Sequence, residues 1–252
     1  MDTWKITPLN LGTLQVTSGA QVYKHGVRQN VGEVLTVPCI GWLLQNDSTG
    51  EKMMVDAGPA EDDQWGSTYH NPIEVKEEQK LEYALMQHGV RPEEITAVIL
   101  THLHWDHAYG VLKLPQAKVY VQKEELRYAV SPLPPDSKHY ELNIKSQLPF
   151  FLQFFHQMQL LNGDCTIASG LEVVALPGHS PGSQGVVIQT KNGRYLIAGD
   201  LINDVDNWEK RLPGGLYCNM ADCYASFEKI ERLHVQVLPS HDYAAFELLK
   251  EN

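Results

Sequence analysis

Hydrophobic residues along this chain fall mainly into short runs, separated by turns rich in glycine, proline and polar residues. Runs of this kind that are enriched in β-branched and aromatic side chains are typical of strands. The pattern predicts strands at 11–19, 33–46, 52–56, 97–100, 118–122, 171–176, 184–190, 193–200 and 235–239. We therefore expect a core that is built mainly from β-sheet.

Helical spacing is confined to a few segments. In 74–89, Val75, Leu81 and Leu85 are spaced as on one face of a helix, and Gly89 is a suitable stop. We also expect helices at 123–130, 148–161 and 220–234. The polar stretch 60–72 is too rich in turn residues for regular structure, and 131–170 is the least regular part of the chain.

Two segments share one pattern. Residues 50–58 (GEKMMVDAG) and 192–200 (NGRYLIAGD) both run from a turn into an apolar strand that ends in Asp and Gly. Two ββα halves that face each other would produce this echo, although any buried strand can end in Asp. With no linker or low-complexity tract, we expect a single α/β domain over 1–252.

Composition narrows the class of protein. Lys and Arg total 20 and Asp and Glu total 31, so the net charge is −11, which argues against binding of nucleic acid or of an anionic membrane. No apolar run approaches the roughly 18 residues of a membrane span. Four scattered cysteines indicate a reducing compartment, and the first residues do not resemble a signal peptide. These features predict a soluble cytoplasmic protein.

The most informative segment is HLHWDH, which contains His102, His104, Asp106 and His107. At a strand end, side chains two residues apart point the same way, so His102 and His104 can bind one ion. If a helix begins near Trp105, Asp106 and His107 point elsewhere and can reach a second ion. Imidazole and carboxylate together suit divalent metals, of which zinc is the usual occupant.

Three further residues complete a ligand set for two ions. His179 lies in a Gly/Pro loop between two expected strands, Asp200 ends the strand YLIAGD, and His241 follows the last strand. Loops at strand ends present such groups from a rigid scaffold. A carboxylate such as Asp200 can bridge two ions through its two oxygens.

In their order along the chain, HLHWDH, PGHSPGS, AGD and PSHD resemble the metallo-β-lactamase-fold superfamily, over about residues 39–242. The resemblance implies an αβ/βα four-layer sandwich with two metal ions at one edge. It implies a first ion on His102, His104 and His179. It implies a second ion on Asp106, His107 and His241, with Asp200 between the two. Asp56 matches the Asp that supports the metal loop by hydrogen bonds.

Within this superfamily the chain is most similar to the N-acyl homoserine lactonases, in HLHWDHAYG, VQKEE and SHD. Zinc β-lactamases carry Cys where this chain has Asp200. The resemblance implies that a hydroxide between two divalent ions attacks the carbonyl of a lactone or ester. Asp106 or Asp200 would pass a proton to the leaving alkoxide. Zinc is expected, and Fe, Mn and Co suit the same ligands.

One position departs from the lactonase pattern. Asn203 stands where those enzymes commonly carry a Tyr that contacts the substrate carbonyl, and Tyr109, Tyr217 or Tyr224 could replace it. Three alternatives stay open: another ester or thioester hydrolase, a mononuclear-iron persulfide dioxygenase, and a regulatory protein that kept the fold.

The remaining expectations concern the surroundings of the site. Trp65, Tyr69, Trp105 and Tyr109 could form an acyl groove with 150–155, although a core helix is the favoured interpretation of that Phe-rich stretch. The aromatic 59–73 loop is a possible homodimer contact. The other histidines are expected in surface or packing roles, with His70 the least secure of them: His25, His70, His88, His139, His156 and His234.

Overall fold

The computed structural model describes residues 2–24, 29–145 and 147–249, and within them the strands form two sheets. The order in the larger sheet is β4-β1-β2-β3-β5-β6-β7, and in the smaller one β12-β11-β10-β9-β8. The larger sheet comprises β1 (Trp4–Thr17), β2 (Val34–Asn46), β3 (Lys52–Val55), β4 (Ile73–Glu74), β5 (Ile95–Ile99), β6 (Lys118–Gln122) and β7 (Met158–Leu161). The smaller sheet comprises β8 (Cys165–Ala168), β9 (Leu171–Ala175), β10 (Gln184–Thr190), β11 (Gly193–Ile197) and β12 (Gln236–Leu238).

The helices are short, with the exception of α8. The α-helices are α1 (Ser18–Gln21), α2 (Asp63–Tyr69), α3 (Leu81–Met86), α4 (Trp105–Ala108), α5 (Lys123–Ala129), α6 (Phe150–Gln153), α7 (Val205–Glu209), α8 (Met220–Leu233) and α9 (Ala244–Leu248). Single 3₁₀ turns are η1 (Glu77–Gln79), η2 (Pro92–Glu94), η3 (Tyr109–Lys113), η4 (Pro134–Asp136), η5 (Phe155–Gln157) and η6 (Gly199–Leu201).

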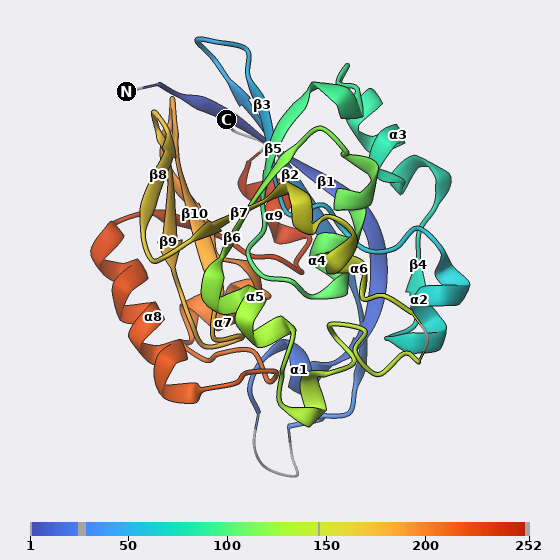
Figure 1. Cartoon of the computed structure of the whole chain (residues 1–252). Helices are drawn as coiled ribbons and strands as arrows, with labels where there is room; N and C mark the ends of the chain where they lie inside the picture. Colours follow the sequence, from blue (N-terminus) through green and yellow to red (C-terminus); the bar gives the residue numbers. More distant parts are fainter. Residues whose placement is uncertain (1, 25–28, 146, 250–252) are drawn as a thin grey trace.

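Three apolar layers separate four structural layers. The central layer joins the two sheets, with Trp42 and Ile99 on one side and Val186 and Ile197 on the other. A second cluster packs the larger sheet against α3 and α6, and a third packs the smaller sheet against α8. In Figure 1, α8 lies at the lower left beside the smaller sheet, and α3 lies at the right. This is the αβ/βα four-layer sandwich that the sequence predicts.

Burial on both faces explains why the central strands are almost continuously apolar. In β3, Met53 and Val55 face the other sheet, whereas Met54 faces the outer helical layer. All three side chains are at most 5% exposed. A strand buried on both faces reads as an unbroken hydrophobic run rather than as an alternation. The run KMMV is therefore a direct signature of the sandwich.

The two segments with a shared pattern occupy corresponding places in the two sheets. Strand β3 is antiparallel to β2 and parallel to β5, and β11 is antiparallel to β10 and parallel to β12. Each parallel pair is joined by a crossover that contains helices. Asp56 follows β3, and Asp200 lies in η6 directly after β11. The carboxyl ends of these strands therefore carry the candidate functional residues of both halves.

Several expected elements differ from the structure. The 60–72 stretch contains helix α2, which begins at the N-cap Asp62, whose side chain accepts a hydrogen bond from the Trp65 N–H. The expected helix at 148–161 is wrong beyond Gln157, because 158–161 forms strand β7, paired with β6. The 74–89 helix is broken into η1 and α3. Strand β8 was not expected.

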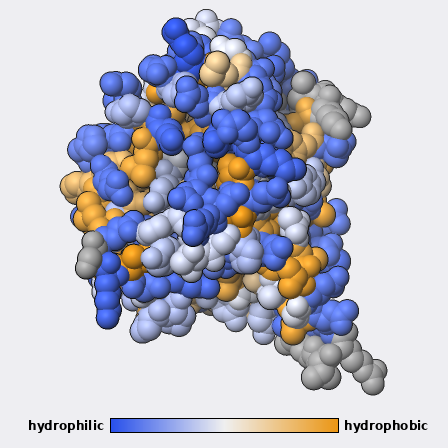
Figure 2. Space-filling model, turned by 90° about the vertical axis from the view of Figure 1, so that its right-hand side faces the viewer, coloured by the Kyte–Doolittle hydropathy of each residue, from blue (hydrophilic) through white to orange (hydrophobic). Residues whose placement is uncertain are grey.

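The surface has no extended apolar region on the face turned to the viewer in Figure 2, which is mostly hydrophilic with separate apolar spots. The four cysteines are free thiols. Within the described part of the chain, no helix has the length and apolar composition that a membrane crossing needs. The homodimer contact at 59–73 stays a prediction.

Two methionines test the importance of the layer between the larger sheet and its helices. Met54 is fully buried in β3, whereas Met86 on α3 is 58% exposed. We expect Met54→Ala to lower the free energy of unfolding by about 2–5 kcal/mol, because it leaves a cavity. Met86→Ala should change it by less than about 0.5 kcal/mol. Denaturant unfolding measures both, and equal losses would contradict this layer assignment.

Candidate metal centre

The residues that the sequence singled out meet at one edge of the sandwich. They come from the loop after β5, from the β9–β10 loop, from η6 after β11 and from the loop after β12. Their potential ligand atoms form three groups, and within each group all these atoms lie within 4.8 Å of one another. The groups are His102, His104 and His179; His102, His107 and Asp200; and Asp106, His107 and His241.

Local backbone structure separates the histidines of HLHWDH as the spacing predicts. His102 and His104 precede the helix, and His104 is the N-cap of α4. Asp106 and His107 lie within α4. In the first group, Nε2 of His179 lies 3.0 Å from Nδ1 of His104. We call His102, His104 and His179 the first set and Asp106, His107 and His241 the second set. The two sets adjoin, because His102 and His107 also meet in the group that contains Asp200.

Asp200 lies between the two sets, with one oxygen toward each. Its Oδ2 is 3.7 Å from Nε2 of His179. Its Oδ1 is 3.0 Å from Nε2 of His107 and 3.2 Å from Nε2 of His241. Asp106 closes the second set, since its Oδ2 is 3.6 Å from Nε2 of His241. This is the arrangement that a carboxylate shared by two ions requires.

The donor chemistry of the cluster fits divalent cations. In four histidines, Nδ1 faces an oxygen outside the cluster and Nε2 faces inward. The pairs are His102 with Thr101 Oγ1 (3.0 Å), His107 with Asp56 Oδ2 (2.9 Å), His179 with the Leu216 carbonyl (2.8 Å) and His241 with the Pro38 carbonyl (2.8 Å). In the neutral imidazoles that bind a metal, each Nδ1 therefore carries the proton and leaves Nε2 as a bare acceptor.

The surroundings of two of these inward-facing Nε2 atoms indicate that the cluster binds a cation. Nε2 of His102 is buried without a hydrogen-bond partner. Nε2 of His107 lies 3.2 Å from Nε2 of His241, a separation at which the two nitrogens of neutral imidazoles would repel each other. Buried polar atoms are nearly always paired, so atoms in this state indicate a missing positive partner. Imidazole nitrogens and carboxylates are the ligands that zinc and similar metals accept.

The electrostatics of the two sets differ. Burial lowers the pKa of His102 and His104 well below the usual value, and neighbouring imidazoles lower it further. For His107, burial opposes charge, but the Asp200, Asp106 and Asp56 carboxylates raise the pKa well above its usual value. Burial would raise the pKa of Asp200, yet His107 and His241 hold it well below its usual range. The second set is the more negative side of the site.

Asp56 connects the metal loop to the end of β3. Its Oδ1 accepts from the Thr101 N–H (2.7 Å), and its Oδ2 accepts from Thr101 Oγ1 (2.8 Å) and from His107 Nδ1 (2.9 Å). The Thr101 hydroxyl donates to Asp56, so it accepts from Nδ1 of His102. One buried carboxylate therefore orients both His102 and His107, the supporting role that the resemblance implied.

Glu125 on α5 is a second support that the sequence analysis missed. Its buried carboxylate accepts from the Leu103 N–H (2.9 Å), from the Tyr140 hydroxyl (3.0 Å) and from Ser180 Oγ (2.5 Å). It thus fastens the His102–His104 turn to the loop that holds His179. A Cβ at Gly182 would lie 2.0 Å from the Glu125 nitrogen, so only glycine allows this approach.

A small pocket of about 50 Å³ opens above the cluster. Its polar side comprises His104, Asp106, Asp200, Asn203 and His241, among other residues, and its apolar side includes Leu14, Val16, Trp105 and Leu216. The pocket therefore combines the cluster with apolar walls, which is the usual make-up of a small-molecule site.

A family model described as the metallo-beta-lactamase superfamily matches residues 37–241 of the chain. The chain belongs to this superfamily. The match spans most of the sequence and includes every residue of the cluster.

Known proteins similar to this superfamily member include lactonases. An N-acyl homoserine lactonase of a Bacillus species is 27% identical over 191 residues, covering 72% of this chain and 71% of the relative. The AttM lactonase of Azorhizobium caulinodans is 27% identical over 172 residues, 65% of this chain and 64% of its own length. A Bacillus thuringiensis AiiA mutant with N-decanoyl-L-homoserine bound at its active site has a TM-score of 0.80 at 21% identity, covering 98% and 97% of the two chains. The family match and these relatives identify the chain as a metal-dependent hydrolase that acts on ester bonds. This confirms the prediction from the sequence.

The tyrosines considered as replacements at Asn203 do not line the pocket above the cluster. Tyr109 lines a separate pocket of about 380 Å³ together with Trp65. The ring of Tyr217 packs edge to face on Tyr23, and that of Tyr224 packs on Phe227. Asn203 itself lines the pocket, so this position contributes an amide in place of a phenol.

The expected acyl groove is wrong in its Phe-rich part. Phe150, Phe151 and Phe154 are at most 1% exposed and belong to the core beneath the larger sheet. This is the core role that the sequence favours for the stretch, although Phe155 at its end is 54% exposed. Among the aromatic residues considered, Trp105 lines the pocket above the cluster.

Two histidines expected in packing roles lie close to the site. His139 lines the pocket, and its ring stacks on His104 with centroids 4.8 Å apart. His70 stacks on Trp105 at 4.2 Å, and its Nε2 lies 3.0 Å from Oε1 of the buried Glu141. Both pack against the metal loop, although neither belongs to the three ligand groups. His25 lies outside the described residues.

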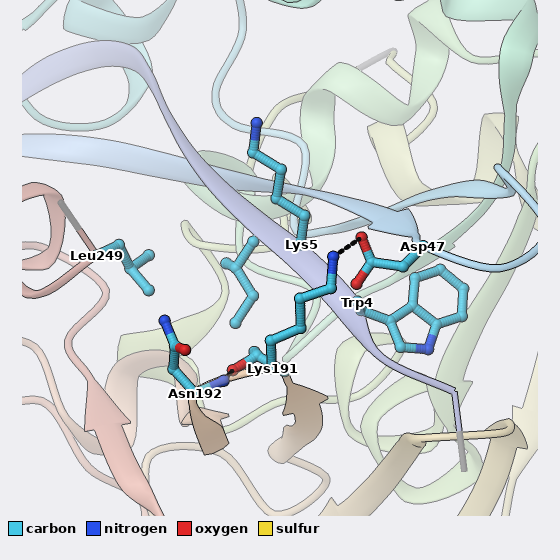
Figure 3. A pocket seen from close by; sticks show the side chains of 8 residues that line it. Trp4, Lys5, Asp47, Lys191, Asn192 and Leu249 are labelled. Atoms are coloured by element: carbon cyan, nitrogen blue, oxygen red, sulfur yellow. Dashed lines mark hydrogen bonds and ion pairs between the residues drawn. The ribbon is translucent and has the colours of Figure 1, made fainter. Parts of the chain in front are cut away.

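A different pocket, of about 240 Å³, lies at the other end of β11. Figure 3 shows it between the start of β1, the β10–β11 turn and Leu249, with an ion pair of 3.2 Å between Lys191 and Asp47. None of the seven cluster residues lines this pocket, so it is separate from the metal centre.

Asp56→Asn tests the supporting carboxylate. An amide nitrogen in place of one oxygen would face donors, so His107 and His102 lose their fixed orientation. We expect metal affinity to fall about 10- to 100-fold, measured by chelator competition. The matched control is Asp206→Asn, an exposed residue on α7 that pairs with Lys210. Unchanged affinity in a folded Asp56→Asn variant would refute this role.

Two adjacent glutamates test the role of Glu125. Glu125→Ala removes the shared acceptor of three buried donors, and we expect it to lower the free energy of unfolding by about 3–5 kcal/mol. The side chain of Glu124, the neighbouring residue on α5, is 52% exposed. Glu124→Ala should change stability by less than about 0.5 kcal/mol. Similar thermal midpoints for the two variants would contradict the supporting role of Glu125.

Proposed function

We propose that this chain is a dinuclear-metal hydrolase that opens the ring of an N-acyl homoserine lactone or a similar lactone. The observation that carries the proposal is the cluster of seven acceptor side chains in two sets, with one oxygen of Asp200 toward each. The lactonase relatives add support, because their substrate is a small lactone with an apolar chain. The pocket above the cluster has matching apolar walls.

In this proposal His102, His104 and His179 hold a first divalent ion, and Asp106, His107 and His241 hold a second, with Asp200 shared. Bound divalent ions supply a nucleophilic water of lowered pKa and polarise the carbonyl oxygen. Zinc is the occupant we propose, and Fe, Mn and Co are alternatives that a metal analysis of the purified protein distinguishes.

The chain's own residues orient the reaction and move the proton. Asp106 and Asp200 both line the pocket, with side chains 13% and 12% exposed, so each carboxylate can meet a bound substrate. One of them takes the proton of the attacking water and returns it to the alkoxide oxygen that leaves when the ring opens. The walls formed by Leu14, Val16 and Leu216 receive the acyl chain.

The first experiment is ring opening of N-hexanoyl-homoserine lactone, followed with a pH indicator, on zinc-loaded and metal-stripped protein. We expect activity that is lost on stripping and restored by zinc. His104→Asn and Asp200→Asn should each lower kcat/KM at least about 100-fold, since each removes a proposed ligand. The exposed His88 provides the matched control, and His88→Asn should stay within about twofold.

The outcomes separate the proposal from its alternatives. Two bound ions without lactone opening would redirect the search to other esters and thioesters. One iron per chain, with oxygen uptake on a persulfide, would replace the proposal with a dioxygenase. A protein that retains no metal would point to a regulatory role.

A further inference from the structure

Asn203 lines the pocket above the cluster, and its side chain carries a buried acceptor without a partner. The residue is 6% exposed, and its own N–H donates to Asn207 Oδ1 (2.7 Å). Its carbonyl accepts from the His241 N–H (2.8 Å), and its Nδ2 donates to the Gln21 carbonyl (3.0 Å). The remaining polar atom, Oδ1, is buried and has no partner. Three bonds thus hold the residue in place and leave one group free.

The orientation of the side-chain amide is fixed by its surroundings. If the amide were turned over, Oδ1 would face the Gln21 carbonyl, and two acceptors would repel each other. That carbonyl also accepts from Nδ2 of Asn207 (3.3 Å), so it is surrounded by donors in the present arrangement. The free group is therefore an oxygen, and it can only accept a hydrogen bond.

The neighbouring pocket residues do not satisfy this oxygen. Asp106 and Asp200 present carboxylate oxygens, which are acceptors too. Gln21, another residue of the pocket, uses its side-chain Nε2 to donate to the His241 carbonyl (3.1 Å). A buried acceptor without a partner is costly and is rarely kept without a reason. A ligand of the pocket is a direct source of the missing donor.

We infer that Asn203 Oδ1 accepts a hydrogen bond from an N–H or O–H group of the substrate, next to the bond that is cleaved. This inference rests on the proposed function and deepens it. A plain lactone or ester ring contains only acceptor oxygens and leaves Oδ1 unpaired. The preferred substrates are therefore lactones with a donor substituent beside the ring carbonyl, such as an acylamino N–H. Asn203 acts as a specificity-determining residue.

Binding can be tested without turnover. The probes are 2-hexanamidocyclopentanone, which has an N–H, and 2-(2-oxoheptyl)cyclopentanone, in which CH₂ replaces it; neither contains an ester. Calorimetric titration of the zinc-loaded protein should give a Kd about tenfold lower for the amide, the size expected of one hydrogen bond. The metal-stripped protein should keep the ratio, because the acceptor belongs to the chain.

Two variants isolate the acceptor. Asn203→Leu and Asn203→Asp both lose the Nδ2 bond to Gln21, but only Asp keeps an oxygen at this position. We expect the amide preference to fall to within about twofold in Asn203→Leu and to persist in Asn203→Asp. The thermal midpoint and the metal content of both variants check folding. The same ratio should appear in kcat/KM for N-hexanoyl-homoserine lactone against its CH₂ analogue.

Each outcome of these experiments either supports or overturns the inference about Asn203. Equal affinity of the wild type for the two ketones, or binding of neither, overturns the inference, and the first result would mean that water occupies the acceptor. Lactone opening without any preference would overturn the inference and leave the proposed function intact. A clear amide preference in binding without lactone opening would support the inference while the proposed reaction fails.

Discussion

Repulsion between bare acceptor atoms is the constraint on which the functional edge of this protein depends. Nε2 of His102, His107 and His241 and both oxygens of Asp200 point into one small volume, and when the imidazoles are neutral none of these atoms carries a proton. Left to themselves, such groups would move apart or turn toward water. They stay together because the outward side of each imidazole is fastened to an oxygen elsewhere in the fold. The hydrogen bonds around the cluster are therefore what makes a cation site possible.

The hydrogen bonds that hold the ligand side chains explain the conformation of Asp56 and the position of Glu125. Asp56 has a φ of +53°, a conformation that Asp tolerates better than most residues, and its carboxylate reaches Thr101 and His107 from there. Glu125 is placed at the start of α5, directly after β6, where it meets two loops at once. In both cases a buried carboxylate links two segments of the chain. The sandwich supplies rigid strand ends, and these carboxylates transfer that rigidity to the ligands.

Sequence reasoning succeeded where a pattern has a single physical cause. The unbroken run in β3 requires burial on both faces, and the spacing in HLHWDH requires a strand end followed by a helix start. It failed where the deciding contact is distant in sequence. Nothing local marks 158–161 as a strand, because its place is fixed by pairing with β6. Glu125 and Tyr140 lie 15 residues apart and share a hydrogen bond that no spacing rule predicts.

Substrate recognition in the pocket depends on which acceptor atoms face the metal centre and which face the rest of the substrate. In the proposed function the cluster uses its acceptors on cations, so it would hold the reacting ester group without distinguishing what is attached to it. That distinction falls to the residues around the cluster, where Leu216 and Val16 offer only apolar contact. Asn203 is neutral, buried and fixed on three sides, so it can favour a substituent without disturbing the charge of the ligand set. Catalysis and selection can thus change independently, since the two tasks rest on different atoms of neighbouring residues.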